Sequence, residues 1–423
     1  MTWDKSKAEQ TYCPLPWLHL ATNATGRLRV CCNSFTGNNK LLHDNGSFVK
    51  ATDIKQVSDL DKNKTLMELR RQMLNGERPD TCRRCFHEED NGIISSRMVY
   101  NEQFGEIDVA LKETKSTGEA PHKFQYLDLR LGNLCNLRCR MCNPYTSSQL
   151  VDESAELGII SAEDVAFLKN MDWPESTKLW DLLESNLSTI DLIYLTGGEP
   201  TLILEQLRLL KACIDRGYAK NITLKYNTNV TNIPKKFLDY WKEFKKVKIN
   251  CSVDGLDDVC RYIRNPSNWK AIDKNLKMID QIAGTHSNID VEIHTTVQVA
   301  NITRLIEIFD YFSKFKNITN FPFLNLLTNP PYYNIKILPQ HIKDEVSNEL
   351  LTWYEENKSK YEGTHASSPN KIHKIPGLIS YMKMDDWSHH AKEFKKYTVW
   401  FDKSRDEEFV SVAPRLKDWY ESI

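Results

Sequence analysis

From Phe124 onward, the chain alternates short apolar runs with longer stretches in which apolar residues recur every three or four positions. Short runs rich in β-branched and aromatic residues predict strands, and the longer periodic stretches predict helices. The predicted strands cover residues 124–132, 190–198, 222–229, 247–255, 290–299 and, less distinctly, 321–327. Amphipathic helices are predicted over residues 204–217, 268–282 and 303–315. The alternation predicts an α/β fold with a parallel sheet and right-handed crossovers, open or closed into a barrel.

The predicted strands separate their polar from their apolar residues. In the strand at 247–255, Val247, Ile249 and Cys251 share one face, because alternate residues of a strand point to opposite sides. The polar alternates of four strands are Tyr126, Asp128, Arg130, Thr223, Lys225, Asn227, Asn229, Lys248, Asn250, Ser252, Asp254, Glu292, His294, Thr296 and Gln298. If helices cover the apolar faces, these residues line an interior that holds ligands and water rather than a packed core. An open sheet with one wet face is the alternative.

The flanking regions differ in character from this core. Residues 150–188 are too long for one crossover helix and predict an insertion. Leu66, Leu69 and Met73 predict a helix in the first part of the chain, and a further amphipathic helix is predicted after residue 338. The predicted organisation is a Cys-bearing module at 1–101, a core at 102–330 and an α-rich extension at 331–423.

Composition narrows the class of protein. The 423 residues carry a formal net charge of -1 with interspersed signs, which argues against nucleic-acid binding driven by bulk charge. No apolar run is long enough for a membrane span, and the first residues lack the apolar core of a secretory signal, so we expect a cytoplasmic protein with no membrane partner. The chain has eleven cysteines, of which Cys213, Cys251 and Cys260 are scattered and the other eight are grouped. Such grouping in a reducing compartment indicates metal or iron–sulfur ligation rather than disulfides.

The segment LGNLCNLRCRMCNP places Cys135, Cys139 and Cys142 directly after a predicted strand. Thiolates are the ligands of iron–sulfur clusters, and three of them on one loop can hold a four-iron cube while leaving one iron open. An open coordination position is what a catalytic metal centre needs. A zinc loop completed by a distant ligand, or three free thiols, are the alternatives.

The following predicted strand ends in YLTGGEPTL. Gly197 and Gly198 permit a close approach of a ligand to the backbone, and Glu199 places a carboxylate at the carboxyl end of the strand. In barrels this end carries the active site. A glycine turn with a solvent-facing glutamate is the structural alternative.

CNLRCRMC followed by GGEP resembles the radical S-adenosylmethionine (SAM) superfamily over residues 123–328. The resemblance implies a partial (β/α)6 TIM-type barrel in which a [4Fe-4S] cluster on Cys135, Cys139 and Cys142 binds SAM and cleaves it to a 5′-deoxyadenosyl radical. The implied SAM contacts are Gly197, Gly198, Glu199, Asn227, Ser252, Asp254 and Arg264. The family usually has an aromatic residue before the third cysteine, whereas this chain has Met141, whose thioether can pack on the adenine ring.

The first hundred residues resemble the auxiliary-cluster modules called SPASM or twitch domains, through YCPLPWLHL, GRLRVCC and RRQMLNGERPDTCRRC. In most relatives such a module follows the barrel, and here it precedes it. The resemblance implies a second [4Fe-4S] cluster held by Cys13, one of Cys31 and Cys32, Cys82 and Cys85. A zinc site on the same cysteines is the alternative.

The function expected is that of a radical SAM enzyme, of oxidoreductase or transferase type, that abstracts hydrogen from a substrate C–H bond. The resemblance implies a flavodoxin- or ferredoxin-like reductant and a peptide or protein side chain as substrate. A small metabolite, sugar or nucleotide is the alternative substrate. A non-catalytic electron carrier or zinc-stabilised binding module is the alternative from another class.

Overall fold

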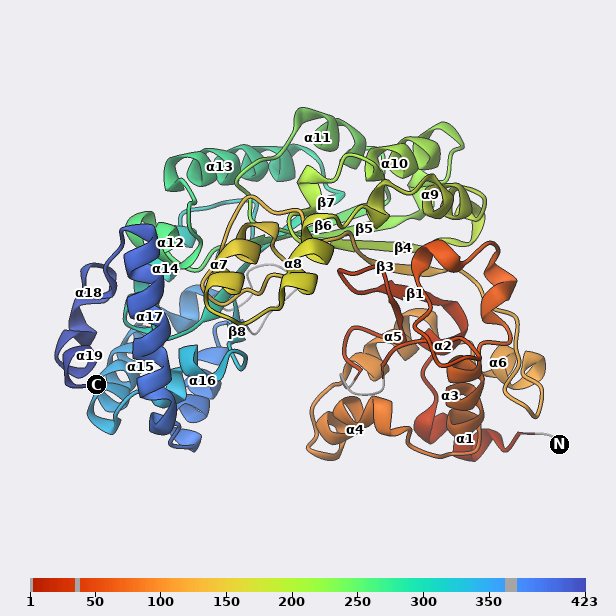
Figure 1. Ribbon diagram of the computed structural model, residues 1–423, viewed down its shortest axis with the longest axis horizontal. Coiled ribbons are helices and arrows are strands. Elements are labelled where there is room, and N and C mark those ends of the chain that lie inside the picture. The colour runs from red at the N-terminus through yellow and green to blue at the C-terminus, as the bar shows by residue number, and fades with distance from the viewer. Residues whose placement is uncertain (1–2, 35–38, 362–370) are drawn as a thin grey trace. The chain divides into compact units, whose positions relative to one another are not determined.

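The computed structural model describes residues 3–34, 39–361 and 371–423, which divide into two compact units (Figure 1). Unit 1 comprises Met1–Leu134, Ala155–Tyr226 and Asp239–Lys246. Unit 2 comprises Cys135–Ser154, Asn227–Leu238 and Val247–Ile423. The chain therefore passes between the units several times, and each unit is described by itself.

The eight strands follow the sheet order β2-β1-β3-β4-β5-β6-β7-β8. Their bounds are β1 (His19–Thr22), β2 (Leu28–Arg29), β3 (Tyr126–Arg130), β4 (Leu192–Thr196), β5 (Thr223–Thr228), β6 (Lys246–Ser252), β7 (Ile289–Val297) and β8 (Phe323–Leu326). In unit 1, β2 pairs antiparallel with β1, while β1, β3, β4 and β5 pair in parallel. In unit 2, β6, β7 and β8 pair in parallel. The predicted α/β fold with a parallel sheet is confirmed, and each of the six strands predicted from residue 124 onward is present.

Helices connect and cover these strands. The N-terminal part holds α1 (Lys5–Thr11), α2 (Leu15–Leu18), α3 (Lys64–Leu74), α4 (Arg83–Asp90), α5 (Ser96–Phe104) and α6 (Ile107–Glu113). The predicted insertion forms α7 (Val151–Glu156), α8 (Ala162–Lys169) and α9 (Thr177–Glu184). Between later strands lie α10 (Gln206–Asp215), α11 (Lys235–Trp241), α12 (Asp257–Ile263), α13 (Trp269–Thr285) and α14 (Leu305–Phe312). The C-terminal part adds α15 (Gln340–Tyr361), α16 (Lys374–Met384), α17 (Ala391–Arg405), α18 (Phe409–Val412) and α19 (Lys417–Ser422).

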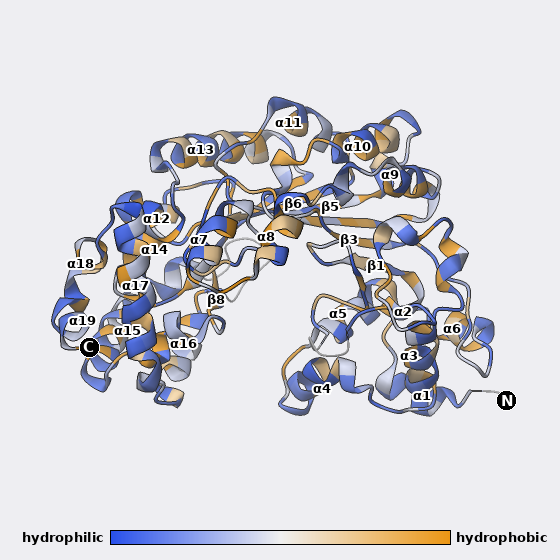
Figure 2. Ribbon diagram, in the orientation of Figure 1, coloured by the Kyte–Doolittle hydropathy of each residue, from blue (hydrophilic) through white to orange (hydrophobic). Residues whose placement is uncertain are grey.

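Apolar burial explains these elements. Helix α13 buries Ile272, Leu276 and Ile279, which recur at helical spacing, and it packs against β7. Strand β4 is mostly hydrophobic in Figure 2, in keeping with a strand that is covered by protein. Among the described residues, no helix combines the length and the apolar character that a bilayer crossing requires.

The N-terminal segment joins the sheet through β1, which pairs in parallel with β3. These contacts were not predicted, because β1 has 4 residues and β2 has 2, too few for an alternating pattern to stand out. The domain boundaries at residues 101 and 330 remain predictions.

Candidate functional site

The loop with Cys135, Cys139 and Cys142 runs without helix or strand from the end of β3 to Ser148. The backbone N–H groups of Arg138 and Arg140 donate to the carbonyls of Asn265 and Ile263, at 2.6 and 2.9 Å. The residues between them, Cys139 and Arg264, are thereby brought to the same side of this extended pairing. Cys135 and Cys139 are buried, and Cys142 is exposed.

A cation stands beside the middle cysteine. Arg264 is buried, and its Nη1 lies 4.0 Å from Cys139 Sγ. Its Nε donates to Asp254 Oδ2 at 2.7 Å, and the backbone N–H of Thr296 donates to Asp254 Oδ1 at 2.7 Å. Although burial acts in the opposite direction, the Asp254 carboxylate raises the pKa of Arg264 above its ordinary value. Burial raises the pKa of the Cys139 thiol, and the guanidinium of Arg264 acts against that rise in favour of the thiolate, the form that ligates iron.

Other predicted SAM contacts of unit 2 lie at or near the carboxyl ends of neighbouring strands. Asn227 in β5 accepts a hydrogen bond from Asn250 Nδ2 at 2.7 Å, and Ser252 is the last residue of β6. Gln298, directly after β7, donates to Met141 Sδ at 3.7 Å and thereby orients the thioether. This edge of a parallel sheet is where ligands bind in α/β folds.

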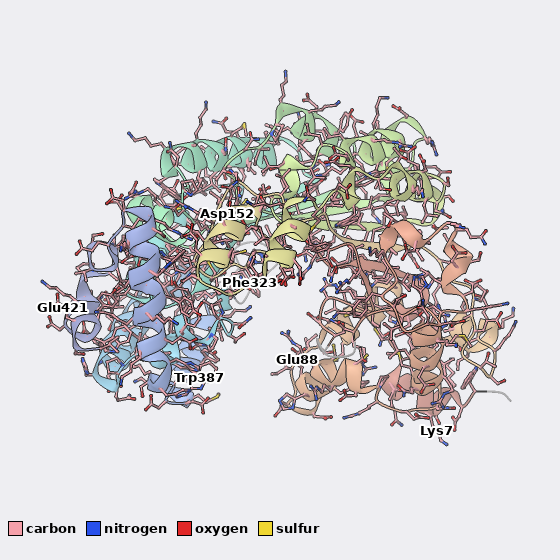
Figure 3. The ribbon with its side chains drawn as sticks, in the orientation of Figure 1. Lys7, Glu88, Asp152, Phe323, Trp387 and Glu421 are labelled. Carbon is pink, nitrogen blue, oxygen red and sulfur yellow. The ribbon has the colours of Figure 1, made fainter. Side chains whose placement is uncertain are left out.

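His294 in β7 has a more specific environment than an ordinary polar wall residue. Its ring stacks on that of Phe323, which Figure 3 labels, with 5.0 Å between the ring centres. The Nζ atom of Lys374 lies 3.2 Å from the centre of the Phe323 ring. Burial acts in the opposite direction, but His294 and Lys371 lower the pKa of Glu292 to about 2. The carboxylate of Glu292, which pairs with His294, orients the histidine ring.

The glycine-glutamate segment at the end of β4 packs against the residues just before Cys135. A Cβ on Gly198 would lie 2.1 Å from the Leu134 carbonyl oxygen, and Gly197 has a φ of +135°. The backbone N–H of Glu199 donates to the same Leu134 carbonyl at 2.8 Å. Glu199 is buried, and its Oε1 accepts from Thr201 Oγ1 at 2.7 Å. Because Leu134 is bonded to Cys135, glycine at 198 sets the start of the cysteine loop.

We expect Gly198→Ala to lower the free energy of unfolding by about 1–3 kcal/mol, the usual cost of an overpacked site. It should also lower the iron content, because the Leu134 backbone has to move. Gly377→Ala is the matched control, since its added methyl meets nothing within 4 Å among the described residues. Denaturant unfolding and iron analysis of both variants measure the effect. Equal stability of the two variants would contradict the close packing at Gly198.

The sequence model described as "Radical SAM superfamily" matches residues 129–296. Residues 129–296 therefore form a domain that matches the radical SAM superfamily. This family implies a [4Fe-4S] cluster and SAM as cofactors, and the matched residues contain the cysteine loop, the glycine-glutamate segment and the Asp254–Arg264 pair. No curated protein sequence is significantly similar to the chain.

Three solved structures are similar to the chain over part of its length. Native anSMEcpe with bound AdoMet and the Cp18Cys peptide is 16% identical, with 56% of this chain and 61% of that chain covered and a TM-score of 0.36. SuiB from Streptococcus suis bound to S-adenosylmethionine is 15% identical, with coverages of 53% and 43% and a TM-score of 0.32. TYW1 with a lysine-pyruvate adduct is 13% identical, with coverages of 59% and 76% and a TM-score of 0.29. The match to anSMEcpe spans less than two thirds of that chain.

The cysteine loop also contacts the C-terminal part of unit 2. Arg140, between Cys139 and Met141, is buried and pairs with Asp402 at 2.6 Å and Glu407 at 2.8 Å. Its guanidinium lies 3.6 Å from the centre of the Tyr262 ring. Sequence reasoning missed these partners, because the contacts join residues 262 and 267 positions apart.

Three further charged residues, joined in two ion pairs, support the same loop. Glu153 of α7 binds Arg138 at 2.8 Å, and it binds the buried Arg405 of α17 at 2.6 Å. Arg138 also donates through Nε to Asn265 Oδ1 at 2.7 Å. The C-terminal part therefore contributes directly to the position of the cysteine loop.

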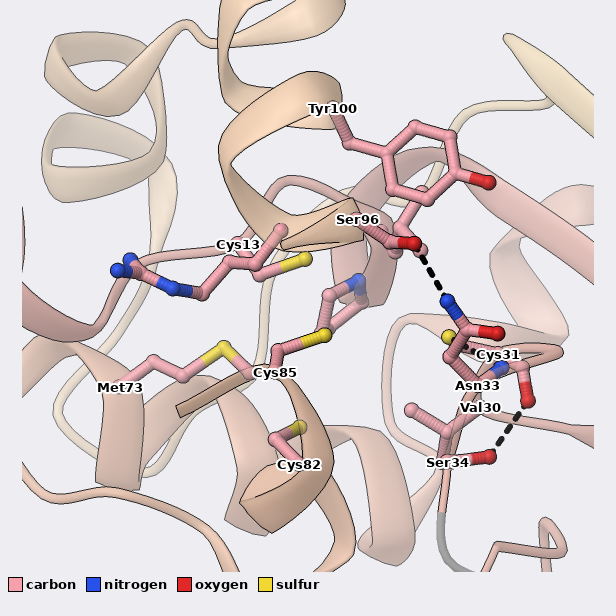
Figure 4. A pocket seen from close by; sticks show the side chains of 13 residues that line it. Cys13, Val30, Cys31, Asn33, Ser34, Met73, Cys82, Cys85, Ser96 and Tyr100 are labelled. Atoms are coloured by element: carbon pink, nitrogen blue, oxygen red, sulfur yellow. Dashed lines mark hydrogen bonds between the residues drawn. The ribbon is translucent and has the colours of Figure 1, made fainter. Parts of the chain in front are cut away.

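Four of the five N-terminal cysteines surround one pocket of unit 1 (Figure 4). Cys13 lies between α1 and α2, Cys31 follows β2, Cys82 precedes α4, and Cys85 lies within α4. Helical spacing places Cys82 and Cys85 on one face of the chain. Burial raises the pKa of Cys82 to about 12 and raises that of Cys85 in the same direction.

Polar groups fix the geometry of this pocket. The backbone N–H of Asn33 donates to Cys31 Sγ at 3.2 Å. Arg97, which lines the pocket, donates to the Tyr12 carbonyl at 2.9 Å and pairs with Glu89 of α4. Arg97 thus links the segment of Cys13 to the helix of Cys85. This bracing was not predicted from the sequence.

The two adjacent cysteines differ in their surroundings. Cys31 lines the pocket, whereas the charged neighbours of Cys32 are Asp128, Arg29 and Arg130 of the sheet. The interaction with Cys31, followed by the two arginines, lowers the pKa of Cys32 to about 7. Within the described part of the chain, no three His, Cys, Asp or Glu side chains are grouped to hold a single metal ion. The thiolates of a four-iron cluster bind different irons and stand farther apart than the ligands of one ion.

Proposed function

We propose that the chain is a radical SAM enzyme that reductively cleaves SAM and abstracts hydrogen from a C–H bond of a substrate. The observation that carries this proposal is the loop of Cys135, Cys139 and Cys142, whose middle cysteine lies beside the buried Arg264. Three thiols on one loop leave one iron of a four-iron cluster without a protein ligand. A buried guanidinium at Cys139 offsets part of the negative charge that such a cluster brings.

Cys135, Cys139 and Cys142 would hold the cluster, and the open iron would take the amino and carboxylate groups of SAM. When bound, the cluster supplies the electron that cleaves the sulfonium and yields the 5′-deoxyadenosyl radical. Asp254 uses one carboxylate oxygen on Arg264 and the other on the Thr296 N–H. We therefore propose that Asp254 positions Arg264, and that Arg264 is the residue of this pair that contacts SAM.

The other residues would bind SAM through its amino group, its ribose and its adenine ring. Glu199, buried beside the glycine pair, would accept from the amino group of SAM. Asn227 and Ser252 would bind the ribose hydroxyls. Met141, oriented by Gln298, would pack on the adenine ring.

We further propose that Cys13, Cys31, Cys82 and Cys85 bind an auxiliary [4Fe-4S] cluster, and that Cys32 is not a ligand. The support is that these four cysteines line one pocket, where an N–H group faces the Cys31 sulfur. Four thiolates complete the coordination of such a cluster. Zinc is the alternative, and we favour iron because the same chain carries the radical SAM motif.

The substrate we propose is a peptide or protein side chain. It is supported by the resemblance of the N-terminal cysteines to modules that occur in peptide-modifying relatives. SuiB has also been solved with its precursor peptide SuiA. None of the eleven cysteines forms a disulfide, which agrees with a cytoplasmic enzyme. We propose a flavodoxin- or ferredoxin-like protein as its electron donor.

The experiment is anaerobic reconstitution with iron and sulfide, followed by SAM and dithionite and by chromatography of the products. We expect 5′-deoxyadenosine to form only when both SAM and dithionite are present. Cys213→Ala is the control, because this buried thiol of α10 belongs to neither cysteine group and its loss should leave the product yield unchanged. A fully loaded protein that forms no 5′-deoxyadenosine would favour the electron carrier instead.

A further inference from the structure

One row of side chains crosses the sheet of unit 1 from β2 to β5. The strand registers pair Arg29 with Ala21, Ala21 with Asp128, Asp128 with Tyr194, and Tyr194 with Lys225. Residues directly opposite each other on paired strands point to the same face of a sheet. The row therefore places two cations, a carboxylate and a phenol on one face.

A third cation belongs to the same face. Arg130 lies two residues beyond Asp128 in β3, and alternate residues of a strand share a face. Arg29, Arg130 and Lys225 all act electrostatically on Asp128. These four residues carry three positive charges and one negative charge, and the thiol of Cys32 also lies among them. The side chains of Arg29 and Asp128 are only 9% and 1% exposed, so water screens these charges poorly.

Several buried polar atoms of this group make no hydrogen bond within the described residues, and both Asp128 oxygens are among them. Arg29 Nε and Nη2 and Arg130 Nε are buried without a hydrogen-bond partner among residues 3–34, 39–361 and 371–423. The Asp128 oxygen nearest to Arg29 Nη2 is 3.6 Å away, beyond the length of a strong charge-assisted bond. Buried unpaired donors of this kind cost free energy that a ligand with acceptor oxygens recovers.

Ala21 stands between Arg29 and Asp128 in the row, and its short side chain lets the two charged side chains approach each other to 3.6 Å. Lys225 lies 4.9 Å from the centre of the Tyr194 ring, which holds the ammonium group against the sheet. A planar guanidinium presents paired N–H donors that match the two oxygens of a carboxylate or phosphate.

We propose that Arg29, Arg130 and Lys225 bind an oxyanion of the substrate, a carboxylate or a phosphate. This inference rests on the proposed function, since it describes how that enzyme holds its substrate. Arg29 stands two residues before Cys31, so the anionic end of the substrate lies beside the N-terminal cysteine pocket. A substrate without an acidic group would leave the arginine donors unpaired and would bind more weakly.

The test is calorimetric titration of the reconstituted protein with inorganic phosphate and, separately, with glutarate, in the absence of SAM and dithionite. We expect saturable binding of at least one probe, weakened at least about tenfold in Arg29→Gln and in Arg130→Gln, because each removes a charge-assisted hydrogen bond. Tighter binding of phosphate indicates a phosphorylated substrate, and tighter binding of glutarate indicates an acidic one. Arg78→Gln removes the same charge at a position with 53% side-chain exposure and should bind as the wild type does.

A second measurement needs no variant. Phenylglyoxal modifies accessible arginines, and mass spectrometry of the digested wild-type protein locates the modified residues. Bound phosphate or glutarate should protect the half-buried Arg130 but not Arg78. The inference is overturned if neither probe binds, if binding does not depend on Arg29 and Arg130, or if a bound probe does not protect Arg130. Because no SAM cleavage is measured, that result would leave the proposed radical chemistry standing.

Discussion

Replacing Arg140 by methionine is expected to lower the free energy of unfolding by about 3–5 kcal/mol, the range for breaking a buried ion pair from one side. Arg140 is buried, and the substitution leaves Asp402 and Glu407 without their cation. Glu407 is itself only 2% exposed, so water cannot take the place of the guanidinium. Methionine keeps much of the side-chain length, so the loss reports on charge more than on volume. Denaturant unfolding, monitored by tryptophan fluorescence, measures the change.

Arg415→Met is the matched control for this substitution. Arg415 also pairs with two glutamates, Glu345 and Glu349, but all three side chains are at least 35% exposed. Exposed pairs contribute at most about 1 kcal/mol, so this variant should unfold close to the wild type. Adding Asp402→Asn and Glu407→Gln to Arg140→Met should restore part of the stability, because it removes the unpaired charges. A similar small loss in both single variants would show that the Arg140 network is not a buried ion pair in solution.

The same variant tests a link between the C-terminal part and the cofactor. Arg140 stands between Cys139 and Met141, and its backbone N–H donates to the Ile263 carbonyl at 2.9 Å. If the side chain loses its partners, the loop that carries the cysteines loses a fixed point. We therefore expect Arg140→Met to hold less iron after reconstitution than Arg415→Met does, at a temperature where both remain folded.

The local pattern of residues was sufficient to predict much of the fold. Strand β7 shows why, since its buried residues alternate along the whole element and no competing period is present. Helix α15 buries Ile342, Val346, Leu350 and Trp353, the positions that its apolar spacing predicts. Both elements are long, and each encodes its own burial pattern.

Contacts between distant segments could not be predicted in the same way. The pairing of β1 with β3 joins short strands more than a hundred residues apart, and no residue within β1 specifies that partner. Asp254 was predicted to bind SAM on the basis of its motif. A motif gives the residue type at the end of a strand, but it does not give the neighbours of the side chain. In the structure its two oxygens bind Arg264 and Thr296, which only the folded arrangement reveals. The sequence likewise could not show that Cys31, rather than Cys32, lines the N-terminal pocket.

Removing the cysteines of one cluster is expected to have the largest effect on the iron content of the protein. Two [4Fe-4S] clusters require about eight irons per chain, and replacing Cys135, Cys139 and Cys142 together by alanine should reduce this to about four. The same variant should form no 5′-deoxyadenosine, because the open iron that binds SAM is gone. Iron and sulfide analysis of the reconstituted protein, with product chromatography, measures both effects.

A complementary variant separates the two sites. Cys82→Ala combined with Cys85→Ala removes two of the four thiols of the N-terminal pocket and leaves the radical SAM loop intact. It should also retain about four irons, now in the cluster that binds SAM, since two thiolates cannot hold a four-iron cube securely. Zinc in the N-terminal pocket of the wild type would refute the auxiliary cluster while sparing the radical SAM cluster. Because the two cysteine groups are separate, we expect the two sites to assemble independently. Loss of all iron from either variant would contradict this expectation.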